Sequence, residues 1–184
     1  MAANVRVQSY AAPLQLPVAY REPRWYAAHT SANHEKRVAE QLLARSVDHF
    51  LPLYGSARRW KDRQVHLELP LFAGYVFVRL ALRDRLQVLE IPGVARLVGF
   101  SSGPVPLPDE EIEALRTSLA CGVRALPHPF LTVGRRVRIK AGPLAGQQGV
   151  LLRGKGNWRV ILSVELIQRS IAVEIAAGEL EPAG

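Results

Sequence analysis

Apolar residues recur along the chain at three spacings, and each spacing predicts a different kind of element. Strict alternation with polar residues over 64–71 predicts a strand with one exposed face. The aromatic and β-branched run over 75–78 predicts a central strand covered on both faces. Apolar residues three and four apart over 34–46 predict a helix with one buried stripe. Further strands are predicted at 25–30 and 94–100, and a short helix from about residue 84.

One more helix has clear start and stop signals. Pro108 and the three acidic residues at 109–111 mark its first turn, where the helix dipole favours anions. Ile112 and Leu115 begin its apolar stripe, and Gly122 can end it in the left-handed conformation. The order of these elements predicts an α+β unit, in which a mostly antiparallel sheet is packed with helices.

The end of the chain has a different pattern. Residues 130–184 combine short β-branched runs with frequent glycines, which predicts four or five short strands joined by tight turns. So small a sheet protects its edges best by closing, so we expect a small β-barrel. The sequence therefore divides into a flexible tail (1–23), an α+β domain (24–122), a proline-containing linker (123–129) and a barrel domain (130–184).

Composition and charge narrow the classes of protein. The chain has 184 residues, a formal net charge of +8 and 48% hydrophobic residues, as expected for a globular protein that approaches nucleic acid. No apolar run is long enough to span a membrane, and the start lacks the apolar stretch of a secretory signal. A single cysteine, Cys121, excludes an internal disulfide. We expect a cytoplasmic monomer that binds neither membrane, metal nor cofactor.

The sequence patterns that could indicate a catalytic or metal site are incomplete or have a structural explanation. The five histidines show no metal-binding spacing, and the acidic residues at 109–113 are explained by the start of a helix. Residues 149–156 have the glycine and lysine spacing of a phosphate-binding loop, but Gly156 takes the place of the required hydroxyl residue and the segment is strand-like. A hairpin turn explains it better. The sequence therefore predicts a binding protein and not an enzyme.

A basic cluster surrounds one tryptophan between two strand-like segments. Such a cluster at a hairpin tip suits phosphate neutralisation by the cations and stacking of Trp60 on an unpaired base. A solvated loop with the indole folded back on the domain explains the pattern equally well. The cluster consists of Arg58, Arg59, Trp60, Lys61 and Arg63.

A second cluster is aromatic and lies on the predicted strands. Alternation places Tyr75 and Phe77 on one face of the sheet, and a core accounts for about half of the cluster. If the helices leave that face uncovered, it becomes an apolar groove suited to the helices of a partner. The cluster consists of Trp25, Tyr26, Phe72, Tyr75, Phe77 and Phe100.

The order of these motifs resembles that of NusG-type transcription elongation factors. The segments 25–26, 35, 50–52, 72–78 and 93–94 resemble their N-terminal domain. Residues 133–150 resemble the KOW motif of their C-terminal barrel. Each motif alone is weak, whereas the ordered pair is specific and covers roughly residues 24–184.

The resemblance implies binding to RNA polymerase. N-terminal domains of the family dock an apolar hollow onto the clamp helices of the β′ subunit and reach to the β side, which suppresses pausing and termination. We therefore expect a sheet face that the chain's own helices leave open. The matching positions are His29, Phe72, Gly74, Tyr75, Phe77 and Phe100.

Within the family, the segments 34–38 and 51–54 running into 58–61 are most similar to the specialised UpxY, LoaP and RfaH-like antiterminators. That similarity implies that His34, Arg37 and Gln41 face non-template DNA. Two alternatives stay open: the housekeeping NusG, and an RNA- or ribosome-binding KOW protein, which the 8 basic and 4 acidic residues of 130–184 favour.

The barrel also has a predicted partner surface. Housekeeping members use one loop of the barrel to contact a small-subunit ribosomal protein or the Rho helicase. The corresponding positions here are Leu166, Ile167 and Arg169.

Overall fold

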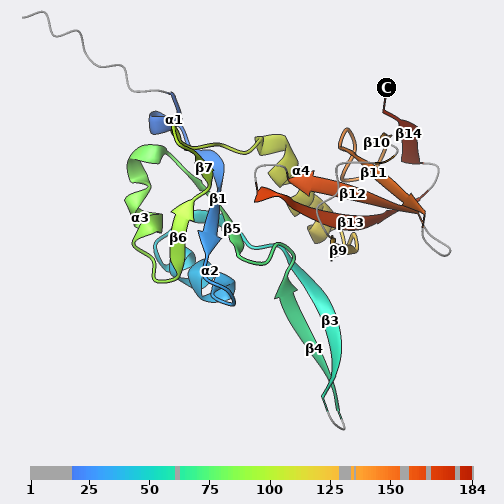
Figure 1. Cartoon of the computed structure of the whole chain (residues 1–184), viewed down its shortest axis with the longest axis horizontal. Coiled ribbons are helices and arrows are strands. Elements are labelled where there is room, and N and C mark those ends of the chain that lie inside the picture. Colours follow the sequence, from blue (N-terminus) through green and yellow to red (C-terminus); the bar gives the residue numbers. More distant parts are fainter. Residues whose placement is uncertain are drawn as a thin grey trace, which may run out of the picture.

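In the computed structural model of the chain, an N-terminal α+β unit and a C-terminal β-barrel lie on either side of one helix (Figure 1). This arrangement confirms the predicted fold class. For residues 58–60, 63, 64, 153 and 158 the backbone is described without the side chain. The structure describes residues 18–60, 63–128, 134, 136–153, 158–164, 167–176 and 179–183.

The N-terminal unit is built on an antiparallel sheet in which each strand alternates between two faces. In the central pair, Ala27 lies opposite Phe77 and Tyr26 lies opposite Val78, so neighbouring strands present matching faces. The strands run in the order β2 (Asp48–Phe50), β5 (Tyr75–Leu80), β1 (Arg24–Thr30) and β6 (Val94–Leu97).

One face of this sheet is covered by the first helices of the chain. Val38 and Leu42 of α2 pack there on Tyr26, Ala28 and Val76, and all five are completely buried. The predicted apolar stripe of this helix is therefore confirmed at Val38 and Leu42, whereas Leu43, also predicted to be in it, is 71% exposed. The covering elements are α1 (Val18–Arg21), α2 (Glu35–Ala44), the 3-10 turn η1 (Leu82–Asp84) and α3 (Leu86–Leu89).

Two hairpins extend from the sheet. Strands β3 (Leu53–Trp60) and β4 (Arg63–Pro70) pair along their whole length and project away from both units (Figure 1). The strand predicted at 94–100 is divided, because the chain leaves β6 to form a small hairpin between β7 (Gly99–Phe100) and β8 (Gly103–Pro104).

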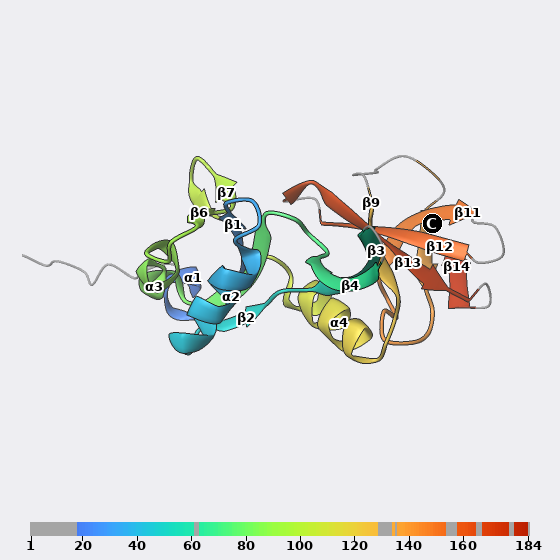
Figure 2. The same cartoon turned by 90° about the horizontal axis from the view of Figure 1, so that it is seen from below.

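Helix α4 (Asp109–Ala120) follows and lies between the sheet and the barrel in both views (Figures 1 and 2). Its bounds agree with the predicted start and stop signals. Gly122, two residues after the last residue of the helix, adopts a φ of +80°, so the predicted left-handed ending is confirmed.

The C-terminal unit is one antiparallel sheet that includes part of the predicted linker. Residues 125–128 are extended, as their prolines require, but they pair with β13 instead of running free. Pro127 lies opposite Ile171 in this pairing. The strand order is β14 (Leu180–Pro182), β10 (Arg136–Ile139), β11 (Gln148–Arg153), β12 (Trp158–Val164), β13 (Arg169–Ile175) and β9 (Ala125–His128).

No helix in the described part of the chain is long and apolar enough to cross a membrane.

Candidate functional site

The sheet face opposite α2 carries the aromatic side chains that the sequence singled out. Trp25, Ala27 and Phe77 point to this face, and all three are completely buried. The rings of Phe72 and Phe77 meet edge to face, with centroids 5.5 Å apart. The ring of Phe50 stacks on the other side, 6.2 Å from that of Phe77. The result is a continuous aromatic floor.

Helix α4 covers one part of this floor. Its Ile112 and Leu115 pack into the same cluster, and the Trp25 Nε1–H donates a hydrogen bond to Glu113 Oε1 at 3.2 Å. Ion pairs also run from α4 to the sheet, with 3.4 Å between Arg79 and Asp109. These pairs are partly exposed, so they contribute much less than the apolar contact.

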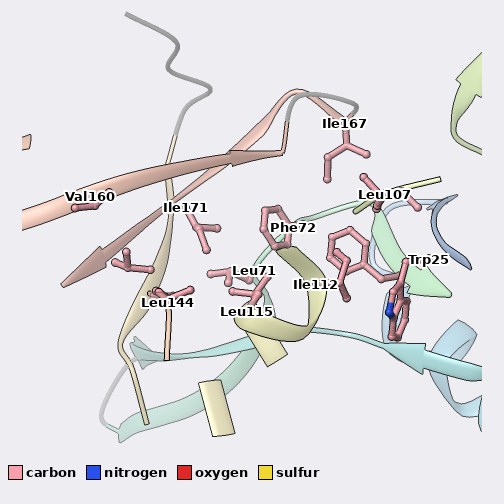
Figure 3. Close-up of a cluster of buried hydrophobic side chains, with 14 of the residues drawn as sticks. Trp25, Leu71, Phe72, Leu107, Ile112, Leu115, Leu144, Val160, Ile167 and Ile171 are labelled. Carbon is pink, nitrogen blue, oxygen red and sulfur yellow. The ribbon is translucent and has the colours of Figure 1, made fainter. Parts of the chain in front are cut away.

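The barrel covers the rest of the floor (Figure 3). Phe72 is 1% exposed and shares one buried cluster with Ile167, which is 4% exposed, and with Ile171. In Figure 3 the ring of Phe72 lies between the α4 side chain Ile112 and the barrel side chain Ile171. A cavity of about 390 Å³ remains beside Phe72, between α4 and the barrel.

Tyr75 lies at the margin of the covered face. Its ring is tilted against that of His29, with centroids 5.3 Å apart. On the barrel side, the guanidinium carbon of Arg169 lies 5.6 Å from the centroid of the Tyr75 ring. This distance suits a cation–π contact between the two units.

These contacts correct one expectation from the sequence. We expected a hollow left open by the chain's own elements, and that expectation is wrong: α4 and the barrel fill it. The physical reason is local, because a barrel joined directly to α4 by β9 has a high effective concentration next to the apolar face. The apolar character of the face was predictable, but its cover was not.

The structure brings five of the six candidate clamp-binding residues together. The sixth, Phe100, is 72% exposed at the β7–β8 hairpin and lies outside the buried cluster. The five that gather around the covered face are His29, Phe72, Gly74, Tyr75 and Phe77.

The candidate DNA-binding residues on α2 lie on its outer side. Arg37 and Gln41 are exposed, one turn apart, while Val38 and Leu42 face the sheet. His34, directly before the helix, is half-buried, and its Nδ1 lies 3.0 Å from the carbonyl oxygen of Ala32.

The basic cluster lies where a hairpin tip was predicted. Trp60 of β3 pairs with Arg63 of β4 at the far end of this hairpin. Lys61 lies outside the described residues, and the side chains of Arg58, Arg59, Trp60 and Arg63 do as well.

The described residues of the candidate partner loop, Ile167 and Arg169, contact the N-terminal unit. Ile167 is buried against the N-terminal unit, and Arg169 lies over Tyr75. Leu166 lies outside the described residues. The sequence signal for this contact was an apolar pair, Leu166 and Ile167, between polar residues.

One titratable side chain, that of Tyr26, is completely buried in the sheet. Burial raises the pKa of the Tyr26 hydroxyl above its ordinary value, and the nearby charge of Arg24 opposes the shift. Within the described ranges, no group of three or more His, Cys, Asp and Glu residues is placed to hold a metal ion.

Comparisons with known proteins agree with this architecture. The family described as "Transcription termination factor nusG" matches residues 23–116. The "Transcription termination/antitermination protein NusG" of Deinococcus radiodurans is 31% identical in an alignment that covers 82% of this chain and 94% of the relative. The chain belongs to the NusG family. The Escherichia coli K12 NusG is 28% identical and covers 87% of this chain and 96% of its own length.

A solved structure shares the fold of this NusG family member. "Domain interaction in Thermotoga maritima NusG" superposes with a TM-score of 0.57 and covers 89% of this chain and 98% of that chain, at 23% identity. The two curated relatives are both named as transcription termination/antitermination proteins.

Proposed function

We propose that this chain is a specialised, operon-directed NusG paralogue that binds the RNA polymerase clamp and suppresses pausing and termination. The observation that supports the proposal best is the aromatic floor of the sheet, where Phe72 and Phe77 meet edge to face beside Tyr75. Aromatic side chains on a rigid sheet are suitable anchors for the helices of a partner.

The covered face adds a condition to this function. Ile167 and Ile171 of the barrel occupy the space that clamp helices would take beside Phe72. Polymerase must therefore bind a form in which the barrel has moved away. A partner that prefers this open form shifts the population by its differential affinity.

Transcription through a terminator with purified polymerase tests the function directly. We expect added protein to increase read-through and to shorten pauses. Pull-down with intact polymerase, compared with polymerase that lacks the β′ clamp helices, tests the site. Equal recovery of the two polymerases would contradict the proposal.

A second candidate is the housekeeping factor, with Rho or the ribosome as partner of the barrel. It is favoured by alignments that cover more than four-fifths of this chain and of NusG proteins from several bacteria. The two candidates differ in their need for DNA sequence. Read-through that is independent of the non-template strand would favour the housekeeping role, and read-through restricted to certain templates favours the specialised one.

A third candidate is an RNA- or ribosome-binding KOW protein that does not act on polymerase. It rests on the basic balance of residues 130–184. Tight RNA binding with a steep salt dependence, together with no binding to polymerase by the open form, would support it.

A further inference from the structure

Glu35, the first residue of α2, has a buried carboxylate. The residue is 4% exposed, and its Oε1 accepts a hydrogen bond from the backbone N–H of Gly74 at 2.7 Å. An acidic residue in the first turn of a helix interacts favourably with the positive end of the helix dipole even when the side chain is exposed. Glutamate is rarely buried unless it is paired, so the dipole alone does not explain this position.

The partner of Glu35 belongs to the turn between β4 and β5. Gly74 has a φ of +86°, and its carbonyl accepts a hydrogen bond from the Thr30 N–H at 2.8 Å. The Tyr75 N–H bonds the Phe72 carbonyl at 3.1 Å, which closes the turn. Both backbone groups of Gly74 are therefore bonded: its N–H to Glu35 of α2 and its carbonyl to Thr30 of β1.

This turn carries two aromatic residues of the candidate polymerase site. Phe72 and Tyr75 flank Gly74, whereas α2 packs on the opposite face of the sheet. Glu35 therefore links the helix layer to a turn that displays side chains on the other side. Its carboxylate does not belong to the aromatic floor.

We propose that Glu35 is a positioning residue, which fixes the turn at Gly74 and so orients Phe72 and Tyr75 for polymerase. This inference rests on the function proposed above. A carboxylate gives a short, charge-assisted hydrogen bond to a backbone amide, and losing it leaves the Gly74 N–H without its acceptor.

Two conservative variants separate this role from a dipole effect. Glu35→Asp keeps the negative charge at the helix start, but its shorter side chain withdraws the carboxylate from Gly74. Glu35→Gln loses the charge but keeps an acceptor oxygen at the same distance along the side chain. A dipole role predicts that Asp substitutes well and Gln poorly, whereas positioning predicts the reverse. Glu40→Ala, at an exposed site on the same helix, is the matched control.

The first measurement uses the full chain alone. Hydrogen–deuterium exchange of the Gly74 amide, compared with amides of β1 and β5, should be roughly tenfold faster in Glu35→Asp. It should stay within about threefold of wild type in Glu35→Gln and in Glu40→Ala. Exchange that is unchanged in Glu35→Asp would overturn the inference.

The second measurement is polymerase affinity, with Ile167→Asp present in every variant to release the barrel. We expect Glu35→Asp to weaken binding at least fivefold and Glu35→Gln to restore it, with melting temperatures recorded for each. Faster exchange at Gly74 with unchanged affinity would overturn the positioning role. If the Ile167→Asp chain that keeps Glu35 does not bind polymerase at all, both the proposed function and the positioning role fail. The exchange data would still show whether Glu35 holds the Gly74 amide.

Discussion

The guanidinium of Arg169 lies over the ring of Tyr75, with 5.6 Å between its carbon and the ring centroid. From the sequence, these residues belong to different docking surfaces, one on the barrel and one on the sheet. In the structure, each surface is occupied by the other. The two surfaces therefore become available together. A partner bound to the sheet should raise the affinity of the barrel for its own partner, and a partner bound to the barrel should raise the affinity of the sheet by the same factor.

Ile167→Asp should release the barrel from the sheet. A carboxylate at a position that is 4% exposed has no partner in the apolar cluster, so the closed form becomes unfavourable. We expect ¹⁵N relaxation to show two units that tumble more independently than in wild type. Leu126→Asp, at a barrel position that is 43% exposed, is the matched control and should leave tumbling unchanged. Identical relaxation in Ile167→Asp and wild type would contradict the closed arrangement.

Tyr75→Ala should weaken polymerase binding more than Arg59→Ala does. The tyrosine contributes apolar area and an aromatic ring to the candidate site, whereas Arg59 lies on the projecting hairpin. The measurement is affinity for polymerase in the Ile167→Asp background, so that loss of the Arg169 contact does not enter. Equal affinities for the two variants, at equal melting temperatures, would remove Tyr75 from the site.

The hairpin tip should bind DNA through its cations. Replacing Arg58, Arg59, Lys61 and Arg63 by Ala should lower DNA affinity and flatten its dependence on salt, because fewer counterions are released. Arg83→Ala, at an exposed arginine of η1, is the control for net charge. If the salt slope stays the same, the cluster is a solvated loop.

Tyr26→Phe should stabilise the N-terminal unit. The Tyr26 hydroxyl is buried and has no hydrogen-bond partner among the described residues, so its removal should raise the free energy of unfolding by about 1 kcal/mol. Burial also raises the pKa of this hydroxyl above 10.0. The folded state thus holds the proton more tightly, so the contribution of this group to stability is constant below about pH 10 and falls above it.

Thermal melts between pH 8 and about pH 11 check this prediction. Wild type should lose melting temperature above pH 10, and Tyr26→Phe should lose less, because one group that must ionise on unfolding is absent. A lower melting temperature for Tyr26→Phe at pH 8 would show that the hydroxyl is satisfied.

Local patterns were enough to predict strands β1 and β5, helix α2 and the ends of α4, but not α1, which falls in the predicted flexible tail (1–23) and packs on the sheet. Val38 and Leu42 share a helix face by spacing, and Gly122 ends α4 as predicted. These features depend on residues close in sequence, where periodicity and capping carry the information.

The long-range contacts could not be predicted from local patterns in the sequence. In the sequence, Glu35 looks like an ordinary acidic residue in the first turn of a helix. No nearby residue indicates that its carboxylate accepts a hydrogen bond from the amide of Gly74, 39 positions away. The cover of the aromatic floor has the same cause: Phe72 is visibly apolar, but an apolar side chain is equally suited to its own barrel and to a partner. Strand β9 was missed because two prolines argue against helix but do not exclude an edge strand.

Strand β9 also limits how far the barrel can travel. Only residues 121–124 separate the last residue of α4 from the first of β9, a span of at most about 18 Å when fully extended. While β9 stays paired with β13, the barrel can rotate about this short connection but stays close to the sheet. A wider movement requires β9 to separate from β13, a pairing to which Pro127 has no N–H to donate.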